Sequence, residues 1–467
     1  MDLKKKIILF LTLIGIYTIY FITSTGMNTS NDGAHIGLAK SIYYEHDLSV
    51  EKYLNVYVNH PDYAVKNGKI YSDRLPGTAI LILPTYAYAN LISNLGVSVS
   101  NSNNEIDIVV SSILPPLLGM LSALMLFWYY FNILKKKYFI SLLCTFIYAF
   151  GTLAWLESSH LFSHAPSLFF VSSAVLLAIS NLQKSWQHKL IMISVLLGFA
   201  TLIELQNFLY YLPILGYLIY KNNLLKKTHR FMFMKSLFFN LVILGVFICG
   251  LLFYNYLAFE DFTLKSNKYN PFFPEERSFF TSLSGNILHG FDALYTSFMN
   301  LEAYINPLKA RLNDIPGLFV TSPVLLLSSF GFILYYKIHK TEALLLLTCI
   351  LIASLIAAMH VTTLVRHIYT INLFLFLPFI FSLEFVLKKS KTIKRNLMLI
   401  GISVLVLISL ARVWFSTISY WGRNFDNIFL YREELKLFLI SNIPLLLIVG
   451  VLSYKRNQQI SVTEKPH

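Results

Sequence analysis

Charged side chains are scarce in this sequence: Asp, Glu, Lys and Arg together make up 13% of its 467 residues. A soluble globular domain carries about a quarter of such residues, so an ordinary water-soluble fold is excluded. Hydrophobic residues make up 56% of the chain, and the mean hydropathy is +0.59. Long apolar runs recur from end to end, which predicts an all-α, polytopic helical membrane protein.

Cysteine is also rare. Cys144, Cys249 and Cys349 lie far apart inside apolar runs, so neither a disulfide framework nor a zinc-type spacing is present. The sequence has no phosphate-binding Gly-rich loop, no dinucleotide fingerprint and no serine elbow. These absences disfavour nucleotide-driven transport and hydrolysis of the soluble type.

The charge that is present is mostly positive, with 38 Lys and Arg against 24 Asp and Glu. The basic residues cluster in short connectors between apolar runs, for example at 135–137 and 388–395. Such clusters mark cytoplasmic connectors and contact anionic lipid headgroups. The charge therefore predicts contact with membrane lipid and no nucleic-acid partner.

The distribution of basic clusters predicts the topology. Lys4, Lys5 and Lys6 precede the first apolar run, which we interpret as an uncleaved anchor with a cytoplasmic N-terminus. If the short apolar stretch 77–94 crossed the membrane, the basic cluster at 135–137 would lie outside. We therefore predict that 77–94 adheres to the membrane surface or re-enters it.

With that assignment, both termini are cytoplasmic and about twelve spans alternate. They lie near 7–23, 108–131, 138–156, 165–183, 189–204, 207–220, 232–254, 317–336, 341–358, 369–387, 397–415 and 437–454. We expect one transmembrane domain over 1–455, external loops with juxtamembrane helices at 24–107 and 256–315, and a cytoplasmic tail at 456–467.

A polar stretch follows the first span and contains Asp32 and His35. Gly33, Gly37 and Ser41 recur every four positions, which on a helix forms a narrow stripe where another backbone can approach closely. Asp32 would then lie at the start of that helix. A carboxylate at this position is either a simple N-cap or a functional group held at the membrane surface.

A second polar cluster in the same loop contains Asp73 and Arg74, followed by the turn signal Pro76-Gly77. One interpretation is a surface ion pair in a turn, with an arginine at the interface. The functional interpretation gives Arg74 a fork of donors for a phosphate at headgroup level.

The connector between two later spans contains Glu157, His160 and His164. Their spacing would place all three on one helical face if the segment were helical up to Pro166. They could contact substrate or phosphate, or only hydrogen-bond headgroups. Two imidazoles with a carboxylate are also an allowed ligand set for a divalent metal, so a metal site stays open.

Two further polar groups interrupt apolar runs. Glu204 lies at the turn between two spans, where a carboxylate faces either a cavity or a polar interface. Arg366 and His367 open a later span, where the arginine either snorkels or meets an anionic partner. In the predicted topology, all these polar clusters emerge on the external face.

These motifs resemble those of multi-spanning, GT-C type glycosyltransferases that use lipid-phosphate sugars, such as protein O-mannosyltransferases and the lipid A aminoarabinose transferase. Asp32 matches the acidic residue of the first external loop in that class, and 73–77 resembles the basic-Pro element closing that loop. The stretch 157–164 lies where the class has a second acidic motif, with a Glu and two His in place of an Asp. The runs 317–323 and 366–378 look like later spans of many members.

The resemblance implies an inverting transfer of one sugar from a polyprenyl or dolichyl phosphate to a glycan, lipid or protein acceptor, on the extracytoplasmic face of the plasma membrane. Asp32 would be the general base, and Arg74, with Arg366 or the histidine pair, would stabilise the departing phosphate. The substrate-binding residues would be His35, Asp73, Arg74, Glu157, His160, His164, Glu204, Arg366 and His367.

Two other functions draw on the same features. A transporter or flippase of lipid-linked saccharides also needs many spans, but it should carry charges deep inside them and show internal repeats. The polar groups here lie near the predicted external surface instead. A polymerase or ligase that uses a lipid-diphosphate donor shares the expected geometry and stays open.

Overall fold

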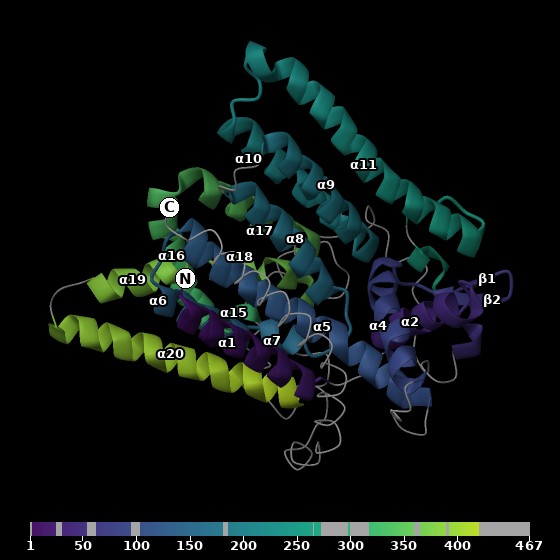
Figure 1. Ribbon diagram of the computed structural model, residues 1–467, viewed down its shortest axis with the longest axis horizontal. Coiled ribbons are helices and arrows are strands. Elements are labelled where there is room, and N and C mark those ends of the chain that lie inside the picture. Colours follow the sequence, from purple (N-terminus) through teal and green to yellow (C-terminus); the bar gives the residue numbers. More distant parts are fainter. Residues whose placement is uncertain are drawn as a thin grey trace, which may run out of the picture.

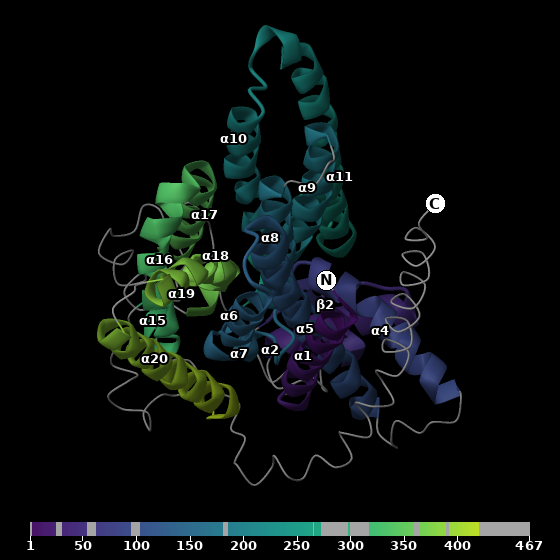
Figure 2. The same ribbon diagram turned by 60° about the vertical axis from the view of Figure 1, so that its left-hand side comes forward.

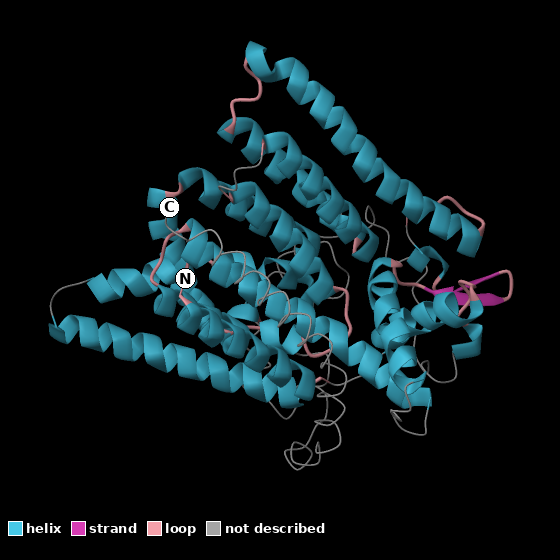
Figure 3. Cartoon of the chain, viewed as in Figure 1, coloured by secondary structure: helices cyan, strands magenta, loops and turns pink. Residues whose placement is uncertain are grey.

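The computed structural model describes residues 2–24, 30–53, 62–94, 103–180, 185–264, 266–271, 298, 317–358, 365–388 and 392–419. Within these ranges the chain is helical apart from one antiparallel hairpin, which confirms the all-α class (Figure 3). Seven described stretches are helical, long and apolar enough to cross a membrane, and three shorter apolar helices accompany them.

The elements follow one another in this order. The α-helices are α1 (Leu3–Ile22), α2 (Ser30–Lys40), α4 (Gly77–Asn94), α5 (Asn103–Trp128), α6 (Tyr138–Gly151), α7 (Ala154–Glu157), α8 (His164–Ile179), α9 (Trp186–Ile203), α10 (Tyr211–Lys221), α11 (Lys227–Phe259), α15 (Leu318–Thr321), α16 (Val324–Ile338), α17 (Lys340–Ala358), α18 (Asn372–Phe376), α19 (Phe379–Lys388) and α20 (Thr392–Ser419). Short π or 3₁₀ segments are η1 (Ser41–Glu45), η2 (Glu51–Tyr53), η3 (Tyr129–Ile133), η4 (Leu205–Tyr210), η5 (Ser266–Tyr269) and η6 (Val365–Ile371), and the strands are β1 (Tyr63–Lys66) and β2 (Lys69–Ser72).

The predicted number of about twelve spans is not confirmed. The predicted span 437–454 lies outside the described residues. The predicted span 207–220 divides into η4 and α10, and the one at 138–156 ends at Gly151, because Thr152 adopts an extended backbone that stops α6. Hydropathy alone does not reveal such breaks, since the residues on both sides are apolar.

The helices pack around α5 and α8 (Figures 1 and 2). α5 contacts α1, α4, α6 and α8, while α8 continues the packing to α9 and η6. α16, α19 and α20 lie together on one side of this centre, and α4 lies on the other (Figure 2). The long helix α11 packs on α9 along one of its faces and exposes many Phe, Met and Leu side chains, as expected for a helix that faces lipid.

The connector between α1 and α5 is built from α2, the β1–β2 hairpin and α4. Asn67 and Gly68 form the hairpin turn, and both have positive φ values, 51° and 77°. An Asn-Gly pair tolerates this backbone, which matches the twist of a two-residue hairpin. The hairpin therefore returns the chain beside α2 and delivers Asp73 and Arg74 to the start of α4.

The close backbone approach predicted at the Gly33, Gly37 and Ser41 stripe is not found at Gly37. A Cβ atom there would meet Val50 and Tyr53 side chains at ordinary van der Waals distances. A close backbone approach in this connector lies at Gly77, where a Cβ atom would come within 2.5 Å of the Leu202 carbonyl carbon. The start of α4 thus rests directly on the backbone at the end of α9.

Replacing Gly77 with alanine should destabilise the protein by about 1–3 kcal/mol, because the added methyl group would displace rigid backbone rather than a flexible side chain. The test is the midpoint of thermal unfolding in detergent. Gly216→Ala is the matched control, since a Cβ atom at that helical position meets no atom within 4 Å. An unchanged midpoint for Gly77→Ala would contradict the close α4–α9 contact.

Candidate functional site

Asp32 and His35 lie on α2, and both side chains are buried. Asp32 is in the first turn of the helix and has no exposed surface, while His35 is 1% exposed. Positions three apart share a helical face, so Asp32 and His35 lie on the same side of α2. Neither ring nitrogen of His35 has a hydrogen-bond partner among the described residues. α2 packs against β2, α4 and α5, which places this face inside the protein.

Arg74 is shared between two carboxylates. Its Nη2 pairs with Asp62, and its Nε lies 3.4 Å from Asp73 Oδ1. Burial opposes the charge, but Asp73 and Asp62 outweigh it and raise the pKa of Arg74 above its usual value. Asn270 donates a 2.9 Å hydrogen bond to Asp73 Oδ2. The Asp73–Arg74 pair predicted from the turn is therefore present, with Asp73 buried and Arg74 partly exposed.

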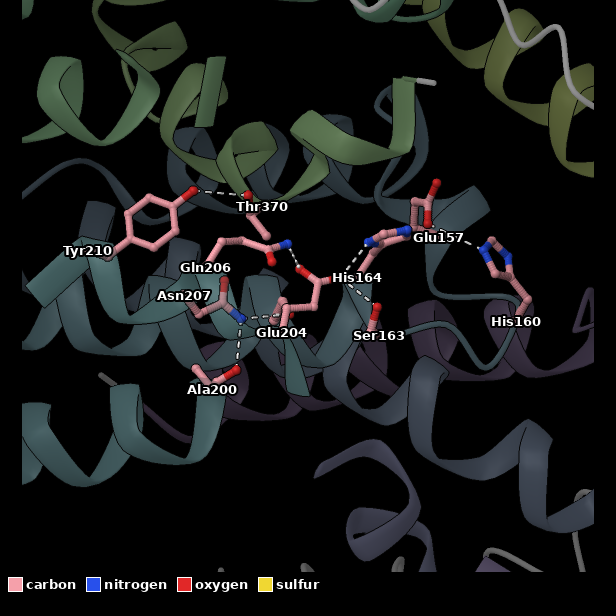
Figure 4. A network of polar contacts seen from close by, with 11 residues as sticks. Glu157, His160, Ser163, His164, Ala200, Glu204, Gln206, Asn207, Tyr210 and Thr370 are labelled. Atoms are coloured by element: carbon pink, nitrogen blue, oxygen red, sulfur yellow. Dashed lines mark hydrogen bonds and ion pairs between the residues drawn. The ribbon is translucent and has the colours of Figure 1, made fainter. Parts of the chain in front are cut away.

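The segment from Glu157 to Pro166 is not one continuous helix, so the condition for a single face with Glu157, His160 and His164 is not met. α7 ends at Glu157 and α8 begins at His164, so the three residues do not share one helix. His160 turns back to Glu157, with Nε2 3.3 Å from Oε2, and both side chains are buried (Figure 4). His164 contacts a different carboxylate.

That carboxylate is Glu204, which collects partners from two elements (Figure 4). His164 Nδ1 lies 3.0 Å from Glu204 Oε1, and the Ser163 hydroxyl donates to the same oxygen at 2.5 Å. Gln206 donates to Glu204 Oε2 at 3.1 Å. α9 stops at Ile203 and Glu204 is extended, which turns its side chain toward the N-terminus of α8. A carboxylate is favoured at that end of a helix dipole.

The charge state of Glu204 follows from these contacts. Burial alone would raise its pKa, but the charge and hydrogen bond of His164, together with the hydrogen bond from Ser163, lower the pKa below its usual value. Glu204 is therefore the ionised partner in a junction between the connector before α8 and the end of α9.

The same junction reaches the later part of the chain. Tyr210 of η4 lies 3.2 Å, oxygen to oxygen, from Thr370 of η6 (Figure 4). η6 also packs on α8. Arg366 and His367 belong to η6, so their backbone enters this neighbourhood, whereas their side chains lie outside the described part of the chain.

Electrostatics connect the first connector with the Glu204 junction. Burial lowers the pKa of His35 to about 3, and the positive charge of Arg74 is the next contribution. Asp62 and Glu204 raise the pKa of His35, while His164 makes a smaller contribution that lowers it. His35 therefore lies in the electrostatic field of Arg74, Asp62, Glu204 and His164. His35 is neutral there at physiological pH.

A metal finds no support in these contacts. Among the residues that the structure describes, no group of three or more His, Cys, Asp or Glu side chains is arranged to hold an ion. Glu157 pairs with His160 and Glu204 pairs with His164, so the ligand set considered from the sequence is divided between two places.

Two members of the site were not predicted from the sequence. Asp62 precedes the hairpin without any surrounding motif, and Asn270 lies in the predicted 256–315 loop, most of which is outside the described residues. No sequence motif marks either residue. The fold brings Asp62 to Arg74 and Asn270 to Asp73. Ser163 lies within the polar stretch 157–164, but its bond to Glu204 depends on helix packing.

Two solved structures share this arrangement of helices. One is the Archaeoglobus fulgidus oligosaccharyltransferase in the apo form, with a TM-score of 0.52 and 11% identity over 88% of this chain and 57% of that chain. The other is the oligosaccharyltransferase AglB from the same organism, in complex with an inhibitory peptide and a dolichol-phosphate, with a TM-score of 0.53 and 10% identity over 90% of this chain and 56% of that one. The chain has a GT-C-like fold.

The chain thus spans a little over half the length of these structural neighbours. No family model and no curated protein matches the sequence. The likeness at this level of identity concerns the fold, and it does not distinguish the protein O-mannosyltransferases or the aminoarabinose transferase from other proteins with a GT-C-like fold.

Glu204→Gln should lower the free energy of unfolding of this GT-C-like protein at pH 7 by about 1.5–3 kcal/mol, because charge-assisted bonds to His164 and Ser163 are lost. A lowered pKa means that the ionised carboxylate stabilises the fold above the unfolded-state pKa, near 4.5, and that this contribution disappears as the pH falls through the folded-state pKa. The difference between wild type and variant should therefore shrink on acidification below about pH 4.5.

Unfolding in detergent across a pH series measures this difference. Glu51→Gln is the control, because Glu51 is exposed and its removal should leave the profile unchanged. Parallel pH profiles for wild type and Glu204→Gln would contradict the assignment of Glu204 as the ionised centre of the junction.

Proposed function

We propose that this chain is a membrane glycosyltransferase that moves a sugar from a polyprenyl or dolichyl phosphate to an acceptor on the extracytoplasmic face. The observation that carries the proposal is the fully buried Asp32 carboxylate, on the same helical face as His35 in the first connector. The GT-C-like fold supports it, and the peptide and dolichol-phosphate bound to AglB show which ligands one protein of this fold accommodates.

Asp32 serves as the general base in this proposal. It takes the proton from an acceptor hydroxyl while that oxygen attacks the anomeric carbon of the donor sugar. The new carbon–oxygen bond forms on the face opposite the phosphate, and the bond to the phosphate oxygen breaks with its electrons. The configuration inverts, the lipid phosphate leaves with its charge, and Asp32 holds the proton.

Arg74 stabilises the negative charge that develops on the phosphate. The carboxylates of Asp62 and Asp73 engage its Nη2 and Nε groups, and the side chain is 27% exposed, so Nη1 remains as a donor. The same carboxylates offset its charge, but they also hold the guanidinium in one orientation, which favours transition-state stabilisation. In this proposal His160, before α8, and His164, at its start, add further phosphate or sugar contacts.

The apolar helix α4 holds the lipid tail and adheres to the membrane surface. It begins three residues after Arg74, at Gly77, and is absent from the helices that are long and apolar enough to span. The short separation between Arg74 and α4 supports a role for this helix in holding the lipid tail beside the proposed phosphate site. The acceptor, a glycan, lipid or protein, approaches from the extracytoplasmic side, with both termini of the chain in the cytoplasm of a plasma-membrane protein.

Asp32→Asn should reduce sugar transfer by about 10²–10⁴-fold while leaving the thermal unfolding midpoint near that of wild type, because the amide keeps the shape but accepts no proton. The assay incubates the full-length protein in nanodiscs with polyprenyl phosphates carrying different sugars and follows release of free lipid phosphate. Asp47→Asn, at an exposed position of the same connector, is the control. Wild-type turnover by Asp32→Asn would refute the base assignment.

Arg74→Ala should weaken binding of the lipid-phosphate donor more than binding of the acceptor, by about tenfold or more, because one charge-assisted phosphate contact is lost. Arg74→Lys keeps the charge without the planar fork, so its affinity for the donor should lie between those of wild type and Arg74→Ala. KM for each substrate is the measurement. Equal changes in KM for the donor and the acceptor would mean that Arg74 only holds the loop in place.

Translocation of an intact lipid-linked saccharide without cleavage would favour the flippase alternative.

A further inference from the structure

His35 is the one buried imidazole among the described residues whose two ring nitrogens both lack a hydrogen-bond or ion-pair partner. It is 1% exposed, so bulk water does not satisfy them. A buried polar group without a partner costs roughly 1–3 kcal/mol. A side chain in this state, on the same face of α2 as the proposed base, calls for a ligand with complementary groups.

The chemistry of that ligand follows from the protonation of His35. A neutral imidazole offers one N–H donor and one acceptor nitrogen. Phosphate oxygens only accept, so they would satisfy the N–H and leave the second nitrogen unpaired. A hydroxyl group both donates and accepts, and neighbouring hydroxyls on a sugar ring can satisfy both nitrogens together.

The charges around His35 point the same way. Arg74 and His164 act on it as cations, while Asp62 and Glu204 act as anions. Charges of both signs thus act on the ring, and burial, the largest cause, keeps it uncharged. The first connector thus presents a charged group, Arg74, and a separate neutral group, His35, which suits a substrate with one charged and one neutral polar part.

We propose that His35 binds hydroxyl groups of a sugar through both ring nitrogens and thereby determines which sugar the site accepts. The sugar is that of the lipid-linked donor or that of a glycan acceptor, since both carry the required hydroxyls. This inference rests on the proposed glycosyl transfer but concerns sugar recognition, which can be measured separately from catalysis.

Binding provides the first test. Full-length protein in nanodiscs is heated with a short-chain polyprenyl phosphate, or with the same lipid phosphate carrying glucose, mannose or arabinose. Wild type should be stabilised more by at least one sugar-bearing lipid than by the bare lipid phosphate. His35→Leu should lose that difference, whereas His35→Gln, whose amide donates and accepts, should keep part of it. Equal stabilisation of wild type by all ligands would overturn the inference for the donor sugar.

Transfer provides the second test, with monodeoxy analogues of whichever donor sugar and glycan acceptor wild type uses. Removing one particular hydroxyl should lower kcat/KM of wild type about tenfold, the effect of one lost hydrogen bond to a buried partner. In His35→Leu the same removal should have no further effect. The analogue that shows this behaviour identifies the donor or the acceptor as the ligand of His35.

The outcomes separate the two proposals. If wild type binds lipid-phosphate sugars selectively but releases no lipid phosphate, glycosyl transfer fails while the role of His35 in sugar recognition stands. If His35→Leu slows every donor and acceptor analogue by the same factor, His35 only supports Asp32 or holds an internal water, and the inference is wrong. His46→Asn, an exposed histidine of the same connector, is the matched control and should behave as wild type.

Discussion

A buried carboxylate must be paired, and the Glu204 junction is where this requirement shapes the protein. Leaving such a charge unpaired in an interior that excludes water is strongly destabilising. His164 and Ser163 supply the pairing from the start of α8, so the end of α9 is held against that helix. The Tyr210–Thr370 contact then attaches η6, and with it a much later part of the chain, to the same place.

The first connector reaches this junction through a steric requirement. Gly77 lets α4 start against the backbone of Leu202 and Ile203, immediately before Glu204. Arg74 lies three residues upstream of Gly77, which is why the charge of Glu204 acts on the Arg74 guanidinium. Gly77, which has no side chain, and the paired carboxylate of Glu204 therefore bring together groups that the proposed transfer reaction uses. The charged and neutral groups remain distinct, with Arg74 held by two carboxylates and His35 kept uncharged.

The fold class could be predicted from composition, because an apolar chain with few charges can satisfy its backbone inside a membrane only as helices or a closed barrel. The place of Asp32 in the first turn of a helix, the positive-φ turn at Asn67-Gly68 and the start of α4 at Gly77 also follow from local sequence signals. Each of these features depends on residues within a few positions of one another, so the linear pattern contains the necessary information.

Tertiary structure alone decided the partners. On one continuous helix, Glu157, His160 and His164 would share a face. The helix is interrupted between Glu157 and His164, so His164 contacts Glu204 while His160 contacts Glu157. Ser163 and Glu204 are 41 positions apart, and Asp73 and Asn270 are 197 apart. No local periodicity reports such distances. Which polar groups meet is determined by helix packing, because each buried charge requires a partner and only the folded chain determines which one is within reach.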